Sequence, residues 1–259
     1  MNKVIRAEFG RTINAGLIIA IAGIIFSICF DSFNDLIAGL RNGQGYVGYF
    51  FSNAAFGGMC THYMLPVFTA LPFSVSLCQE RNNKAVSYIV SREGKNRYIF
   101  AKFIVSAISG GFVAVCGTVL LFLMLAMRFP IAGDEFEGAV VSDYFHEWSA
   151  VYYPQLYILT LSILAFCRGV IWSSLALCVS LYTSDFMVVL LSPFLGSYVL
   201  VRIFQIIRVP DMVRPDMILI GQVVIKSSGL TLLIAIAISL TIVTLIGCLL
   251  YTSDAADEL

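Results

Sequence analysis

Long apolar runs separated by short polar segments make up most of this chain. A transmembrane helix needs about 20 predominantly apolar residues, and the runs are about that long. They predict six spans, at Ala15–Phe30, Ala55–Cys78, Phe103–Met127, Tyr157–Leu181, Phe186–Phe204 and a sixth that starts near Leu230. We therefore expect an all-α polytopic membrane protein in which residues 1–247 form a single transmembrane domain.

The segment before the first run has an amphipathic helical pattern. Val4, Ile5 and Phe9 fall on one helical face, and basic residues occupy the others. Such a helix lies in the membrane interface with its apolar side toward the lipid. No small-x-small cleavage pattern follows the first run, so we expect an anchor and not a removed signal peptide.

Composition supports a membrane location and excludes several classes of protein. Hydrophobic residues make up 59% of the 259 residues and charged residues only 12%, whereas soluble domains carry about 25% charged residues. The mean hydropathy is +0.89. A soluble enzyme, a secreted disulfide scaffold and a disordered tail are therefore excluded. Sixteen basic and sixteen acidic side chains cancel, so no overall positive charge indicates a nucleic-acid partner.

Basic residues are concentrated in two predicted loops, and cytoplasmic loops carry an excess of lysine and arginine. The N-terminal segment and the loop after the second span hold Lys3, Arg6, Arg11, Arg81, Lys84, Arg92, Lys95, Arg97 and Lys102. The loop after the third span holds acidic residues between Asp134 and Glu147. We therefore expect both termini in the cytoplasm. Four basic residues near the fifth loop run against this pattern: Arg202, Arg208, Arg214 and Lys226.

The sequence lacks the motifs of catalysis and of metal binding. Its seven cysteines show no CxxC spacing and lie in or beside apolar runs, which is typical of small buried hydrophobic residues. His62 and His146 stand alone. Gly94-Lys95 lacks the upstream glycine of a P-loop. We expect a chain that is not an enzyme and binds no cofactor or metal itself.

The loop after the second predicted span carries a pattern that charge alone does not explain. Val86, Ile89 and Val90 are spaced i, i+3 and i+4, so a short helix there has one apolar stripe. Glu80 stands beside Arg81 where the chain leaves the span. The pattern favours a docking element for a partner. The alternative is an ordinary positive-inside loop whose charges only set the orientation.

Further features extend this pattern along the chain. The Glu80-Arg81 pair closes the second span, a short helix over Ala85–Val90 follows, and Arg97-Tyr98 with Lys102 leads into the third span. Together with the stretch Ser174–Phe194, these features resemble the ABC-2-type permease family, the membrane subunits of ABC exporters. Members of that family have six spans and an inner-leaflet helix before the first.

The resemblance implies a coupling loop that contacts a separate ATP-binding subunit. Its residues here would be Glu80, Arg81, Lys84, Val86, Ile89, Val90, Glu93, Gly94, Tyr98 and Lys102. It also implies that ATP and Mg²⁺ bind to that subunit, and that this chain pairs with a second copy or a related permease. The function expected from the resemblance is export across the plasma membrane, driven by ATP hydrolysis in the partner.

Two other functions remain open. One is a non-transport membrane component, such as an immunity, assembly or sensory protein, in which the loop only sets the topology. The other is an ion-coupled secondary carrier, which an inverted repeat and several intramembrane acids would favour. No such repeat is visible, and no Asp or Glu lies inside a predicted span.

Arg168 lies near the centre of the fourth predicted span, where an arginine costs about 2.5–3.5 kcal/mol on insertion scales. One interpretation is that it faces a water-filled path or a partner subunit. The other is that a kink at Cys167-Arg168-Gly169 lets it snorkel or pair internally. Prolines 66, 72 and 193 predict kinks or breaks in the second and fifth spans. Gly110-Gly111 permits close approach between helices.

The last twelve residues, 248–259, change character abruptly from apolar to acidic. The string Cys248–Glu258 resembles the in-frame translation of a transposon-type sequencing adapter. We therefore expect residues 248–259 to be a non-native tail, with the natural sequence differing after about Gly247. The alternative is a genuine acidic cytoplasmic tail.

Overall fold

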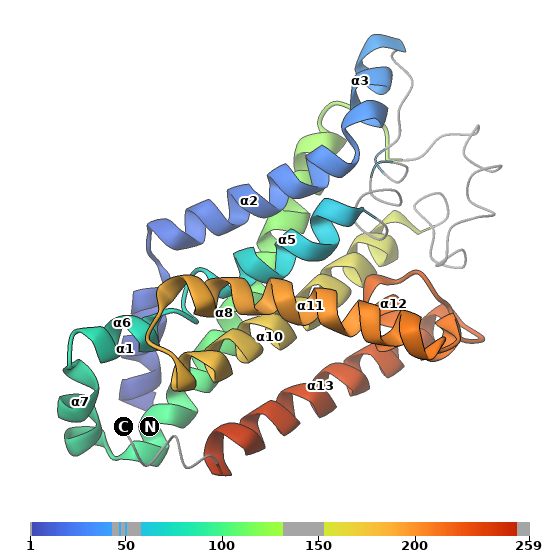
Figure 1. Cartoon of the computed structure of the whole chain (residues 1–259). Helices are drawn as coiled ribbons and strands as arrows, with labels where there is room; N and C mark the ends of the chain where they lie inside the picture. Colours follow the sequence, from blue (N-terminus) through green and yellow to red (C-terminus); the bar gives the residue numbers. More distant parts are fainter. Residues whose placement is uncertain (1, 43–46, 48–49, 51–57, 132–152, 253–259) are drawn as a thin grey trace.

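The computed structural model describes residues 2–42, 47, 50, 58–131 and 153–252 (Figure 1), and among these residues it contains helices and no strand. The predicted all-α class is confirmed. In chain order the described helices are α1 (Asn2–Thr12), α2 (Ala15–Asp31), α3 (Phe33–Asn42), α5 (Met59–Ala70), α6 (Ser76–Asn82), α7 (Ala85–Glu93), α8 (Lys95–Ala126), α10 (Pro154–Tyr182), α11 (Phe186–Ile207), the 3₁₀ turn η3 (Asp211–Val213), α12 (Pro215–Ile220) and α13 (Ser228–Thr252).

Four described helices, α8, α10, α11 and α13, are long and apolar enough to cross a membrane. They match the third to sixth predicted spans. The first predicted span corresponds to α2, which continues into α3 through a bend of 71°. By length and composition the described residues therefore contain four spans, or five if α2 and α3 form one bent span. The predicted number of six is not confirmed.

The second predicted span is not one continuous helix. Its described part consists of α5, a turn segment at residues 71–75, and α6. Pro72 lies in this turn segment, where it supplies no N–H to continue the helical ladder. Pro66 and Pro193 lie inside α5 and α11, and both helices continue through them. One of the three prolines therefore coincides with a break.

The start of α5 is held by the end of α2. The Asp31 carboxylate accepts hydrogen bonds from the backbone N–H groups of Cys60 (3.0 Å) and Thr61 (2.6 Å). These are among the N–H groups that a helix leaves without partners at its first turn. A Cβ at Gly58 would lie 2.1 Å from Asp31 Oδ2, so the contact requires glycine there.

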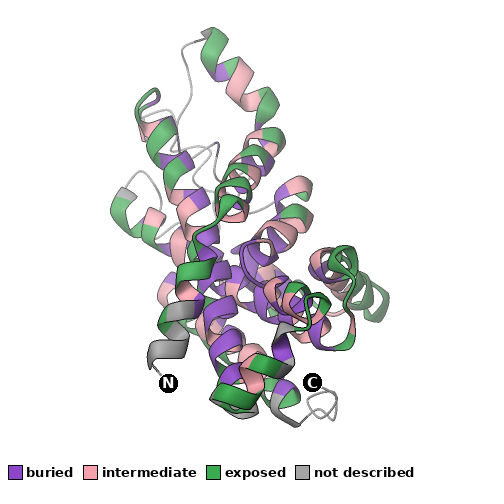
Figure 2. Ribbon diagram, turned by 90° about the vertical axis from the view of Figure 1, so that its left-hand side faces the viewer, coloured by how far each residue is buried: buried purple, intermediate pink, exposed green. Residues whose placement is uncertain are grey.

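The centre of the bundle is the crossing of α8 and α10. A Cβ on Gly169 would lie 2.5 Å from the carbonyl oxygen of Gly110, and one on Gly110 would lie 2.4 Å from Ser173. The close approach expected at Gly110-Gly111 is confirmed. The Ser74 hydroxyl, from the break after α5, donates to the Ser173 carbonyl at 3.0 Å and lies 2.9 Å from the Ser106 hydroxyl. Figure 2 shows buried residues gathered along the middle of the bundle and exposed ones on the outer helices.

The two ends of the bundle carry different elements. The helices α1, α6 and α7 and the start of α8 lie at one end, while α3 and α12 lie toward the other (Figure 1). The basic N-terminal segment and the basic loop therefore share one end, as the charge pattern predicted. The acidic loop at residues 134–147 lies outside the described residues. Residues 248–252 of the expected tail continue α13.

Candidate functional site

A buried ion-pair network lies at the end of the bundle that carries α1, α6 and α8. The Lys102 side chain is 1% exposed, and its Nζ lies 2.9 Å from Glu80 Oε1 and 3.0 Å from Glu8 Oε2. Nζ also donates to the Ser76 hydroxyl at 3.0 Å and lies 4.8 Å from the centre of the Phe73 ring. One lysine therefore joins a carboxylate of α1 to a carboxylate of α6.

Glu80 is the centre of this network. Its Oε1 accepts a hydrogen bond from Arg11 Nη1 at 2.5 Å, and its Oε2 accepts one from the Tyr98 hydroxyl. Arg11 also contacts Glu8 at 3.3 Å within α1. Since every partner is charged or a strong donor, the carboxylate is satisfied where it is shielded from water. The network fastens α1, α6 and α8 to one another.

Arg81 makes a second attachment, to the end of α10. Its Nη1 donates to the carbonyl oxygens of Leu181 at 2.5 Å and of Ser180 at 3.4 Å. Asn82 adds a hydrogen bond to the carbonyl oxygen of Ser184 at 3.1 Å. A cation near the last carbonyls of a helix is favourable because those groups lack partners within the helix and carry negative partial charge. Neighbouring residues of α6 thus connect to different helices.

The apolar stripe of α7 faces the chain's own helices. Val86 is buried, and Ile89 and Val90 are half-buried against a cluster of Leu77, Tyr98, Leu177, Leu181, Ile246 and Leu250. The sequence interpretation placed this stripe against a partner subunit, but the structure places it against α6, α8, α10 and α13. The side chain of Tyr88, on the opposite face, is 74% exposed.

The remaining predicted loop residues divide between two surroundings. Lys84 and Gly94 are exposed at either end of α7, and Gly94 has the positive φ of 83° that was expected. Glu93 belongs to α7, but its side chain is not described. Tyr98 and Lys102 are buried in the network. The residues predicted for the coupling loop therefore lie in one region, where Tyr98 and Lys102 are inside the fold and Lys84 and Gly94 are at its surface.

Glu8 and Ser76 belong to the network but were missed by sequence reasoning, which also treated Arg11 only as a charge that sets orientation. One signal for Glu8 was present. It is the only acidic residue among the first 30, and it stands on a helix whose other charges are positive. An isolated acid in a basic amphipathic helix indicates a specific partner.

Three cavities lined by described residues lie along α5 and the break that follows it. They are called inner, middle and outer, counted from the end of the bundle that carries α6. The inner one, about 520 Å³, is lined by residues including Arg11, Glu80, Leu71 and Pro72. The middle one, about 20 Å³, is lined by Thr61, Leu65 and Arg168 among others. The outer one, about 140 Å³, includes His62, Tyr63, Gln205 and the Arg214–Asp216 pair.

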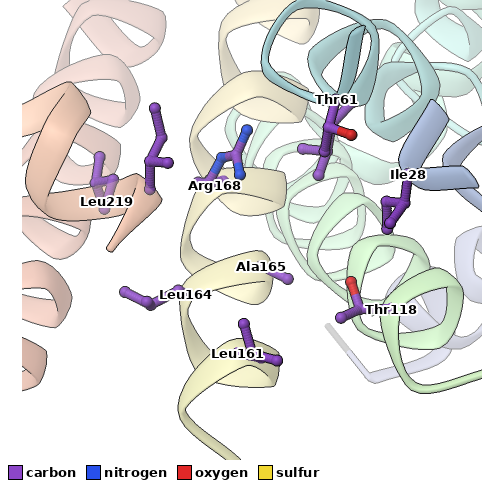
Figure 3. A pocket seen from close by; sticks show the side chains of 10 residues that line it. Ile28, Thr61, Thr118, Leu161, Leu164, Ala165, Arg168 and Leu219 are labelled. Carbon is purple, nitrogen blue, oxygen red and sulfur yellow. The ribbon is translucent and has the colours of Figure 1, made fainter. Parts of the chain in front are cut away.

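Arg168 stands midway along α10 with its side chain turned into the middle cavity. Figure 3 shows it between α5, which carries Thr61, and the segment that carries Leu219. The residue is 7% exposed. Within residues 2–42, 47, 50, 58–131 and 153–252, its guanidinium forms no hydrogen bond or ion pair. Of the two readings from sequence, internal pairing finds no partner in this part of the chain.

The outer cavity contains a paired arginine. Arg214 Nη2 lies 2.7 Å from Asp216 Oδ2, both residues are buried, and a second contact of 3.2 Å reaches Asp211. The hydrogen bonds that the Arg214 guanidinium donates to the Asp216 carboxylate raise the pKa of Arg214, so the arginine stays charged. Two buried arginines thus stand in neighbouring cavities, one neutralised by a carboxylate and one not.

No group of three or more His, Cys, Asp or Glu side chains that could hold a metal ion occurs among the described residues. Comparison with known proteins gives no match: no family model, no curated protein and no solved structure matches the chain.

Proposed function

We propose that this chain is the membrane-spanning permease subunit of an ATP-driven exporter of the ABC-2 type, in a bacterial plasma membrane with both termini cytoplasmic. ATP binding and hydrolysis belong to a separate subunit, and the permease pairs with a second copy or a related permease. The observation that supports this proposal is the attachment of the α6–α7 loop, through buried contacts, to α1, α8 and α10.

That attachment is suited to transmitting movement. Glu80 connects the loop to α1 and α8 through Arg11 and Lys102, and Arg81 connects it to α10. Because these contacts are short and involve charged side chains, with Lys102 buried and Arg11 half-exposed, displacing the loop moves three helices together. A loop that only set orientation would need its basic charges but none of these buried contacts.

The cavities along α5 add a second argument. A rigid, continuous helix would offer a fixed wall to all three cavities, whereas the helical path is broken between α5 and α6, at residues 71–75 beside the inner cavity. Non-helical backbone at membrane depth is tolerated where it lines a cavity or is buried in protein. A change at this break would alter the inner cavity first, as expected of a path that opens to one side at a time.

The exposed face of α7 is the surface that we assign to the ATP-binding subunit. Tyr88 stands at its centre, with Lys84 and Arg92 exposed on the same short helix. Exposed aromatic and arginine side chains are enriched among residues that dominate protein–protein affinity. This surface, and not the Val86–Ile89–Val90 stripe, is the part of the loop that a partner meets.

The test is co-purification with an ATP-binding protein, sought first among the products of neighbouring genes. Tyr88→Ala should insert normally but lose about thirtyfold or more in partner affinity, since truncating an interface hot spot costs about 2 kcal/mol or more. The matched control is Tyr153→Ala, because Tyr153 is also exposed (57%) but precedes α10 at the opposite end of the bundle. Equal retention of the partner by both variants would contradict the assignment, and failure of the wild type to bind any ATP-binding protein would favour a non-transport component.

A further inference from the structure

Among the residues that the structure describes, Arg168 has no oppositely charged partner. The carboxylates on the neighbouring elements are already engaged: Asp31 binds the backbone N–H groups at the start of α5, and Asp216 pairs with Arg214. No carboxylate in the described part of the chain forms an ion pair with Arg168. A buried, unpaired charge costs several kcal/mol, so a residue of this kind indicates a ligand that supplies the missing negative charge.

A second polar group without a partner lines the same cavity. The Thr61 hydroxyl is buried and forms no hydrogen bond with the described part of the chain. The other hydroxyl on the wall, that of Thr118, donates its single proton to the Ala114 carbonyl at 2.9 Å. Thr61 therefore has a proton to offer a ligand, and Thr118 does not. A threonine in a helix populates two side-chain rotamers, which lets this hydroxyl turn toward the ligand.

The rest of the cavity selects by size and polarity. Its other lining residues are apolar, among them Ile28, Leu65, Leu161, Leu164 and Leu219. The volume of about 20 Å³ exceeds the roughly 10–15 Å³ that one water-sized occupant requires. One small group fits there, and an organic molecule as a whole does not.

The Arg168 cavity adjoins the outer cavity. Ile220 lines both the Arg168 cavity and the outer cavity of about 140 Å³, so one side chain stands between the two spaces. The outer cavity is lined in part by polar residues, including His62, Gln205 and Gln222. Movement of Ile220 would let a free ion pass this way, or let a carboxylate reach Arg168 while the rest of its molecule stays in the outer cavity.

We propose that Arg168 and Thr61 form a binding site for a monovalent anionic group, either a halide ion or the carboxylate of a larger molecule. The guanidinium supplies the charge and the hydroxyl a second hydrogen bond. The site stands on its own geometry and does not depend on the exporter proposal. Only the further step, that a bound carboxylate would make the exported molecule anionic, rests on the proposed function.

Iodide is the probe that tests the site, because it quenches tryptophan fluorescence. Trp172 lies one helical turn after Arg168 on α10 and hence on the same face. In the full chain purified in detergent, with Trp148→Phe leaving Trp172 as the only tryptophan, we expect a quenching component that saturates with iodide. Purely linear, collisional quenching would overturn the proposal.

Three variants locate the site. Arg168→Met should abolish the saturable component, and because it removes a buried charge it should not impair insertion. Thr61→Val should weaken iodide binding about tenfold, as loss of a hydrogen bond to a charged group does. Thr118→Val is the matched control and should bind as the wild type does. Saturable quenching that persists unchanged in Arg168→Met would overturn the assignment, as would equal effects of the two threonine variants.

Competition distinguishes the two sources of the anionic group. Displacement of iodide by chloride at lower concentrations than by acetate identifies a halide site, and the reverse order identifies a carboxylate site. Since the measurement uses this chain alone, a negative result removes the anion site without bearing on the ATP-binding partner. Conversely, loss of the partner in the Tyr88 experiment leaves the anion site untouched.

Discussion

At the scale of single residues, the buried basic side chains of the described chain differ in whether a carboxylate pairs with them. Lys102 is surrounded by Glu8 and Glu80, and Arg214 by Asp211 and Asp216. Arg168 has no such surroundings in the described chain. Burial of an ion pair gives little net stability, but removing one member is costly because the other stays buried and unpaired. We therefore expect substitutions in the ion pairs to destabilise the fold, and substitution of Arg168 to impair binding of an anion.

Lys102→Met tests this distinction. It leaves two carboxylates close together with Arg11 as the remaining cation, so we expect the free energy of unfolding to fall by about 3–5 kcal/mol. Thermal unfolding of the purified protein in detergent measures the change. Arg97→Met, on the exposed side of the same helix, should change stability little. Adding Glu8→Gln to Lys102→Met should restore part of the loss, and no recovery would contradict a charge-based cause.

At the scale of helices, sequence periodicity located most elements but not their partners. The stripe Val86–Ile89–Val90 correctly indicated that α7 buries one face, yet the same stripe suits a foreign surface and the chain's own helices equally. Nothing local distinguishes them, because the cluster is completed by Leu177 and Ile246, far away in the sequence. The sequence also did not show which proline breaks the second span. Pro66 and Pro72 carry the same local signal, and the hydrogen bond from Ser74 to the Ser173 carbonyl, which forms at the break, joins residues far apart in the sequence.

The crossing of α8 and α10 gives a prediction at this scale. In Gly169→Ala the new Cβ would lie 2.5 Å from the Gly110 carbonyl oxygen, a backbone atom that can move only with its helix. Overpacking of this kind costs roughly 1–3 kcal/mol, so we expect a clear drop in the thermal unfolding midpoint. Gly10→Ala, where a Cβ meets nothing within 4 Å, should leave the midpoint unchanged or raise it slightly. Equal midpoints for the two variants would show that the helices do not approach this closely.

At the scale of the whole molecule, charge distribution and helix length together determine the expected orientation. The 22 residues of α11 extend about 33 Å at 1.5 Å per residue, which matches the roughly 30 Å of a bilayer core. One end of α11 lies beside α6 and the basic loop, and the other leads into η3 and α12 (Figure 1). The sequence indicated this arrangement through its basic loops, while Arg208 and Arg214 ran against it. The structure explains Arg214 by its pairing with Asp216, which removes that arginine as a free positive charge.

Cysteine labelling at the two ends of the bundle tests the orientation directly. In a background with the seven native cysteines replaced, Tyr88→Cys and Met212→Cys place single thiols on exposed positions of α7 and η3 (74% and 69% exposed). A membrane-impermeant maleimide should label Met212→Cys in intact cells and Tyr88→Cys only after lysis, because basic loops stay in the cytoplasm. Labelling of both thiols in intact cells would mean that α11 does not cross the bilayer. The reverse pattern would place the α6–α7 loop outside, where no ATP-binding subunit could reach it, and would exclude the proposed function.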